Sequence, residues 1–126
     1  MMEIKRILVV DDDNDIRTIA QVSLADVGGW EVILAASGSE ALSLAATHQP
    51  DLILLDVMMP GMDGLTTFTN LRQSDVTREI PVVLVTAKAL RREHEQYLNL
   101  GVEGVIAKPF DPMTLPDTIR GIVRSL

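Results

Sequence analysis

The sequence predicts an α/β domain in which five parallel strands alternate with five helices. Short runs of valine, isoleucine and leucine recur along the chain, and buried parallel strands have this continuous apolar composition. Between these runs, apolar residues follow the 3.6-residue period of a helix. Four of the runs lead directly into residues able to do chemistry, and open α/β sheets bind their ligands beyond the carboxyl ends of the strands.

The expected strands cover 7–10, 32–35, 52–55, 82–85 and 105–107. The first helix has an apolar stripe over 16–27 and ends at Gly28 and Gly29. Ser39 is expected to precede the second helix as its N-cap, and Pro50 follows the end of that helix. A right-handed crossover would join each strand to the next, as in other βαβ units.

The last three helices have shorter stripes, formed by Leu65, Phe68 and Leu71; by Leu90, Tyr97, Leu98 and Leu100; and by Leu115, Ile119, Ile122, Val123 and Leu126. Pro116 is tolerated only in a first turn, where the missing N–H would have no helical partner. The fifth helix is therefore expected to begin within 112–114.

Composition narrows the possible partners and compartment. The chain of 126 residues is 47% hydrophobic, which is enough for a single domain with a packed core. Its net charge of -7 disfavours direct contact with nucleic acid or anionic membranes. The absence of cysteine excludes disulfides and fits a cytoplasmic location. No signal peptide or membrane-spanning segment is evident.

Acidic residues gather at the ends of two expected strands: Asp11, Asp12 and Asp13 follow the first, and Asp56 follows the third. One aspartate, Asp13, suffices to cap the next helix. Further carboxylates at one rim would repel, by roughly 4 kcal/mol for a pair about 4 Å apart at an effective dielectric constant of 20. A Mg²⁺ site explains why several carboxylates lie together better than a structural role does, because Mg²⁺ takes oxygen ligands and its charge offsets their repulsion.

Asp56 is the candidate nucleophile, because a carboxylate can attack phosphorus to form an aspartyl phosphate. The alternative, an N-cap role, is disfavoured because no helix is expected before Asp63 or its neighbour. Pro60 and Gly61 suit a type II turn after the strand. That turn would bring the backbone carbonyl near Met58 over the metal.

The last two strands end on a hydroxyl and an ammonium group. Thr86 could donate a hydrogen bond to a phosphoryl oxygen, and small Ala87 leaves room beside it. Lys108 would be costly to bury unless carboxylates paired with it, and the acidic cluster provides them. An exposed turn at Lys108 and Pro109 is the alternative interpretation. Each signal is weak alone, but together they define one site.

These motifs resemble the receiver domain of two-component response regulators: Asp11-Asp12, Asp56 followed by Met59-Pro60-Gly61-Met62-Asp63-Gly64, Thr86-Ala87 and Lys108-Pro109-Phe110. The resemblance covers the whole chain, so residues 1–126 are expected to form a single receiver domain. It implies a flavodoxin-like, doubly wound sheet with strand order 2-1-3-4-5, and a cis Lys108–Pro109 bond.

The resemblance also implies a role for each site residue. Asp56 would accept the phosphoryl group, and Thr86 and Lys108 would contact its oxygens. Mg²⁺ would be bound by Asp12, Asp56 and the Met58 carbonyl, with Asp11 acting through water. The protein would catalyse only its own phosphorylation and dephosphorylation.

The implied phosphodonor is a sensor histidine kinase or a histidine phosphotransfer protein. In this family the surface formed by the fourth helix, fifth strand and fifth helix contacts downstream proteins, and the domain is a monomer or a phosphorylation-linked homodimer. The sequence departs from the family at Val105, where an aromatic ring usually relays the signal. We therefore expect the signal to pass through Thr86 and the loop that follows it.

Other assignments fit the residue pattern less well. A stand-alone regulator is expected, and a receiver excised from a longer DNA-binding regulator or hybrid kinase is the alternative within the family. An aspartate-nucleophile phosphohydrolase of the haloacid dehalogenase type would need a second aspartate at Met58. A flavodoxin would need a phosphate-binding loop where Asp11, Asp12 and Asp13 stand.

Overall fold

The computed structural model describes residues 3–87 and 91–126 and confirms the predicted alternation of strands and helices. The strands are β1 (Arg6–Val10), β2 (Glu31–Ala35), β3 (Leu52–Asp56), β4 (Val82–Thr86) and β5 (Gly104–Ala107). The helices are α1 (Asn14–Val22) with a π-helical extension η1 (Ser23–Val27), α2 (Gly38–His48), α3 (Gly64–Gln73), α4 (Arg91–Asn99) and α5 (Leu115–Arg124).

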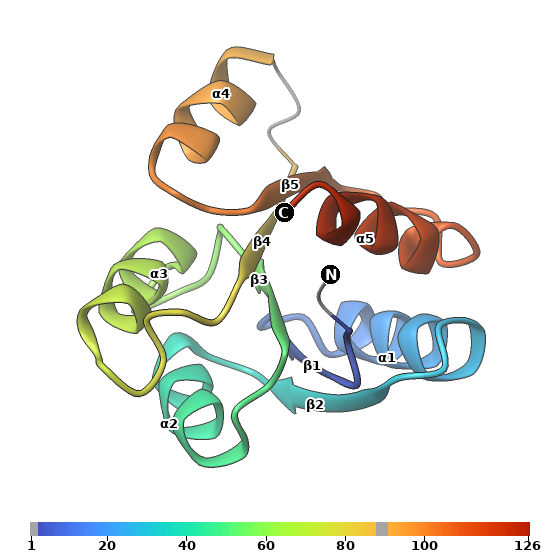
Figure 1. Cartoon of the computed structure of the whole chain (residues 1–126), viewed down its shortest axis with the longest axis horizontal. Helices are drawn as coiled ribbons and strands as arrows, with labels where there is room; N and C mark the ends of the chain where they lie inside the picture. Colours follow the sequence, from blue (N-terminus) through green and yellow to red (C-terminus); the bar gives the residue numbers. More distant parts are fainter. Residues whose placement is uncertain (1–2, 88–90) are drawn as a thin grey trace.

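All strand pairs are parallel, and the sheet order β2-β1-β3-β4-β5 confirms the flavodoxin-like topology. Helices α1 and α5 cover one face of the sheet, while α2, α3 and α4 lie on the other (Figure 1). Because every strand runs in the same direction, the residues that end β1, β3, β4 and β5 gather at one rim.

Side chains alternate between two apolar layers along each strand. In β1, Ile7 and Val9 face the layer under α1 and α5, while Leu8 and Val10 face the layer under α2 to α4. Every residue of β3 and β4 is buried. Such strands require apolar residues on both faces, which explains why they appear in the sequence as unbroken apolar runs.

Three helix boundaries differ from the expectation. The N-cap of α2 is Ser37, not Ser39: its backbone is extended and its side chain accepts a hydrogen bond from the Glu40 amide at 3.1 Å. Helix α5 begins at Leu115, with Thr114 as N-cap and Pro116 in the first turn. The first helical stripe is α-helical only to Val22 and then widens into η1.

Leu90, which the apolar stripe places in the fourth helix, lies outside the described residues. Across 3–87 and 91–126, no helix has the length and hydropathy needed to span a bilayer.

Candidate functional site

The rim at the carboxyl end of the sheet brings together the side chains that follow four strands. Asp11 comes directly after β1, Asp56 ends β3, Thr86 ends β4 and Lys108 comes directly after β5. Asp11, Asp56 and Thr86 are buried, with 3%, 4% and 0% of their surface exposed. Polar groups are rarely buried this deeply without specific partners, so the local contacts define what the site can do.

Three carboxylates converge at this rim. One oxygen each from Asp11, Asp12 and Asp56 lies within 4.8 Å of the other two, and Asp12 is the exposed member of the group. Oxygens bound to one Mg²⁺ at about 2.1 Å must lie within roughly 4.2 Å of each other, so small side-chain movements complete the set. An all-oxygen, triply acidic cluster therefore fits a hard divalent cation.

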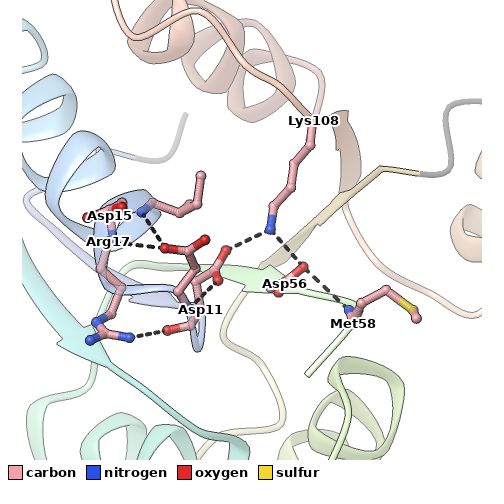
Figure 2. A network of polar contacts seen from close by, with 8 residues as sticks. Asp11, Asp15, Arg17, Asp56, Met58 and Lys108 are labelled. Carbon is pink, nitrogen blue, oxygen red and sulfur yellow. Dashed lines mark hydrogen bonds and ion pairs between the residues drawn. The ribbon is translucent and has the colours of Figure 1, made fainter. Parts of the chain in front are cut away.

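Lys108 lies between two of these carboxylates (Figure 2). Its ammonium nitrogen is 2.8 Å from Asp11 Oδ2 and 3.1 Å from Asp56 Oδ1. The peptide bond between Lys108 and Pro109 is cis, as predicted. With three carboxylates and one ammonium group, the cluster keeps a surplus of negative charge that a divalent ion can neutralise.

The pKa of Asp56 is raised above its ordinary value of 3.8, chiefly by burial and then by the negative charge of Asp11; Lys108 opposes this shift only in part. Burial acts to lower the pKa of Lys108, but hydrogen bonds and charge from Asp11 and Asp56 outweigh it, and the pKa is raised. Lys108 is therefore protonated at neutral pH, while keeping the buried Asp56 ionised costs folding free energy.

This cost predicts how Asp56→Asn affects stability. The folded state holds the Asp56 proton more tightly than the unfolded chain does. Protonated Asp56 therefore adds to the free energy of unfolding; this contribution is fully present below pH 3.8 and is lost as pH rises through the pKa of the folded state. Without divalent ions at neutral pH, Asp56→Asn should therefore raise Tm by a few degrees, at about 4 °C per kcal/mol. The gain over wild type should shrink as pH falls toward 3.8.

Thermal unfolding of both proteins in EDTA across this pH range measures the difference. Asp26→Asn is the matched control, because it removes the same charge from an exposed position on η1. A lower Tm for Asp56→Asn at neutral pH, or a gain that does not vary with pH, would contradict the electrostatic explanation.

The loop after β3 fixes the surroundings of Asp56. The Met58 amide lies 3.4 Å from Asp56 Oδ1, while the Met58 side chain is 62% exposed. Gly61 has a φ of 71°, the left-handed backbone that the expected type II turn requires. Asp63 then caps α3 by accepting a hydrogen bond from the Thr66 amide at 2.8 Å. The loop backbone thus returns to the sheet beside the carboxylate.

Thr86 and Val105 lie on neighbouring strands. The register pairs Asp56 with Val85 and Thr86 with Ala107, so Thr86 is one residue beyond the level of Asp56. The Thr86 carbonyl accepts a hydrogen bond from the Lys108 amide at 2.9 Å, which links the ends of β4 and β5. Val105 is half-buried and packs against the apolar layer under α2 to α4.

Sequence reasoning missed one residue of this rim, Arg17. Its guanidinium donates a hydrogen bond of 2.7 Å to the Asp11 backbone carbonyl (Figure 2). It donates a second one of 3.1 Å to Asn14 Oδ1. A lone arginine in a predicted helix is usually interpreted as a solvated surface side chain. The only signal was its position, one helical turn after the acidic run.

A second feature without a sequence signal is an apolar hollow of about 400 Å³ that adjoins Lys108. It is lined by Ile16 and Ile19 of α1, by Ala87, and by the segment Lys108, Pro109, Phe110 and Pro112. Ile19 is 42% exposed at its edge. The hollow therefore presents apolar surface next to the charged rim.

Comparison with known proteins places this chain in a family. The sequence profile of the response regulator receiver domain matches residues 7–120. The chain belongs to the response regulator receiver family.

Individual relatives show the same relationship. The chain is 40% identical over 120 residues to the alkaline phosphatase synthesis transcriptional regulatory protein PhoP of Bacillus subtilis, covering 95% of this chain and 49% of PhoP. It is 43% identical to the response regulator PleD of Caulobacter vibrioides, covering 94% of this chain and 26% of PleD. The chain thus spans about half or less of these curated relatives.

Solved structures agree. The chemotaxis response regulator CheY4 of Vibrio cholerae superposes with a TM-score of 0.86 at 32% identity, covering 95% of this chain and 99% of that one. A response regulator from Chloroflexus aurantiacus gives a TM-score of 0.85 at 32% identity, with coverage of 97% and 99%.

Proposed function

We propose that residues 1–126 form a single receiver domain that accepts a phosphoryl group from a phosphohistidine donor onto Asp56 in the presence of Mg²⁺. The observation that carries this proposal is the convergence of three carboxylates and one ammonium group at the carboxyl rim of the sheet. Family membership supports it, because receiver domains take part in two-component signalling.

In the proposed reaction, a carboxylate oxygen of Asp56 forms a bond to phosphorus while the phosphorus–nitrogen bond of phosphohistidine breaks. The bonding electron pair leaves with the imidazole, which takes up a proton. Lys108 neutralises charge on the phosphoryl oxygens, and Thr86 is proposed to hydrogen-bond one of them. Asp11, Asp12, Asp56 and the Met58 carbonyl would hold Mg²⁺, which when bound supplies charge neutralisation and orientation of the phosphoryl group.

The direct test is incubation with acetyl phosphate and Mg²⁺ followed by intact-mass measurement. One added phosphoryl group per chain supports the proposal, and an unmodified chain contradicts it. Loss of the modification in EDTA separates a metal-dependent transfer from nonspecific acylation or phosphorylation.

Signalling would follow from a change in the surface that a partner contacts. With valine at position 105, no ring is available to relocate, so we propose that Thr86 and the loop after β4 carry the change toward α4. The proposed contact surface for a downstream protein, or for a second phosphorylated copy, is α4, β5 and α5.

Two arrangements of the gene product are compatible with this chemistry in a cytoplasmic protein. A stand-alone regulator is supported by CheY4, of which this chain covers 99%. A receiver joined to an output region is supported by PhoP, a transcriptional regulatory protein of which this chain covers 49%. The length of the gene's open reading frame decides between them.

The apolar hollow suggests where the phosphodonor docks. It lies beside Lys108, so a partner that packs into it would bring a histidine within reach of Asp56. We expect Ile19→Glu to slow phosphotransfer from a phosphorylated histidine phosphotransfer protein by about tenfold, because a charge then replaces apolar contact area. Transfer from acetyl phosphate, which needs no docking, should be unaffected.

Radiolabel transfer from protein donor and from acetyl phosphate measures the two rates separately. Val76→Glu is the control, since Val76 is 56% exposed and lies in the loop before β4, at the opposite end of the sheet. Equal slowing by both substitutions would argue against docking at the hollow.

A further inference from the structure

We infer that Arg17 is a positioning residue for the divalent cation: it holds the backbone that aims Asp12 at the site. This inference rests on the proposed function, because it concerns the metal site that phosphorylation would use. Arg17 is not a ligand, since its guanidinium contacts a backbone carbonyl and a side-chain amide oxygen.

Four backbone groups of the segment from Asp11 to Asp13 are held by hydrogen bonds. The Asp11 amide donates to the Ala35 carbonyl at 3.1 Å, and the Asp13 amide donates to Asp11 Oδ1 at 2.9 Å. The Asp13 carbonyl accepts from the Arg17 amide at 3.0 Å. The Asp11 carbonyl accepts from the Arg17 guanidinium at 2.7 Å, so this side chain fixes the peptide that joins Asp11 to Asp12.

Asp12 depends on that peptide more than its neighbours do. Asp11 is buried and held by Lys108, and Asp13 is held by its capping hydrogen bonds. Asp12 is exposed, and its carboxylate direction follows from the backbone on either side. A charge-assisted bond of 2.7 Å to the Asp11 carbonyl restrains the rotation that would swing Asp12 away from the cluster.

The second hydrogen bond requires an arginine, because the two terminal nitrogens of its guanidinium group donate to two different acceptors. Bonding of the guanidinium to Asn14 Oδ1 at 3.1 Å ties the start of α1 to the same turn. Lysine has one ammonium group on a flexible chain and does not reproduce this planar pair of donors. We therefore expect Arg17→Lys to replace arginine only in part.

The test is isothermal titration of Mg²⁺ into wild type, Arg17→Ala and Arg17→Lys. We expect Kd to rise about tenfold in Arg17→Ala and about threefold in Arg17→Lys. The Mg²⁺ concentration that gives half-maximal phosphorylation by acetyl phosphate should rise in parallel. If Arg17→Ala does not fold, the threefold change in Arg17→Lys tests the inference, and an unchanged Kd in that variant overturns it.

Arg6→Ala is the matched control, because Arg6 makes the same kind of bond, 2.7 Å from its guanidinium to the His48 carbonyl, at the opposite end of β1. It should lower Tm without changing Kd for Mg²⁺. Unchanged Kd in folded Arg17→Ala would reduce Arg17 to a structural role and overturn the inference alone. Absence of Mg²⁺ binding in wild type would overturn the proposed function as well.

Discussion

Asp56→Asn and Asp56→Ala should remain unmodified under conditions in which acetyl phosphate and Mg²⁺ add one phosphoryl group to the wild-type chain. The carboxylate is the atom group that would attack phosphorus, and an amide oxygen or a methyl group does not replace it. Asp56 also pairs with Lys108 at 3.1 Å, so the cation that neutralises the phosphoryl charge lies next to the point of attack. Intact-mass measurement, followed by peptide mapping of the wild-type adduct, checks both the loss and the position.

Asp63→Asn is the matched control, since it removes one carboxylate from the same loop while asparagine still caps α3. This variant should be modified as fully as wild type. If Asp56→Asn carried as much phosphoryl group as Asp63→Asn, the acceptor would be another residue and the proposed chemistry would be wrong.

The buried strands were predictable because both faces of the sheet are covered. Every position of β3 and β4 must then be apolar until the strand reaches the rim, where Asp56 and Thr86 end the two runs. The polar residue that breaks each run therefore marks both the end of the strand and the site. This coincidence explains why the residue pattern alone predicted that Asp56 and Thr86 lie at the rim.

Contacts between side chains and backbone were not predictable in the same way. Ser37 and Ser39 are both good N-caps, and only the extended backbone at 37 selects the first. Arg17 lies only six positions from Asp11, yet the residue pattern does not reveal that its side chain bonds the Asp11 carbonyl. The bond depends on the exact path of a three-residue turn, which apolar periodicity does not encode.

Long-range ion pairs were also not predictable from the sequence pattern. Arg72 on α3 bonds Glu103 at 2.6 Å and the Ile80 carbonyl at 2.7 Å, joining segments that precede β4 and β5. The two charged residues are 31 positions apart. Their pairing follows from strand order, so it becomes visible only after β4 and β5 are placed side by side.

Gly64→Ala should cause the largest loss of stability among the substitutions considered. A Cβ at this position would collide with the Asp56 carbonyl oxygen and would lie 2.7 Å from Val57 Cα, and both are backbone atoms that side-chain rotation does not move. The Gly64 amide also donates to the Val57 carbonyl at 3.0 Å, so α3 starts directly against the end of β3. Relief requires α3 to move off the strand, at a cost of about 3 kcal/mol or a fall of roughly 12 °C in Tm.

Urea unfolding measures this cost, and Gly121→Ala is its counterpart within α5. A Cβ at Gly121 meets no atom within 4 Å, so alanine there should stabilise the domain by about 0.5–1 kcal/mol through helix propensity. A lower free energy of unfolding for Gly64→Ala and a higher one for Gly121→Ala would show why position 64 requires glycine: the close contact between α3 and β3 excludes a Cβ, and the backbone flexibility of glycine is not the reason. Because Gly64 closes the loop that carries Met58, the folded fraction of Gly64→Ala should also accept phosphoryl groups more slowly than Gly121→Ala. Equal stability of the two variants would mean that α3 shifts freely and does not hold the rim in place.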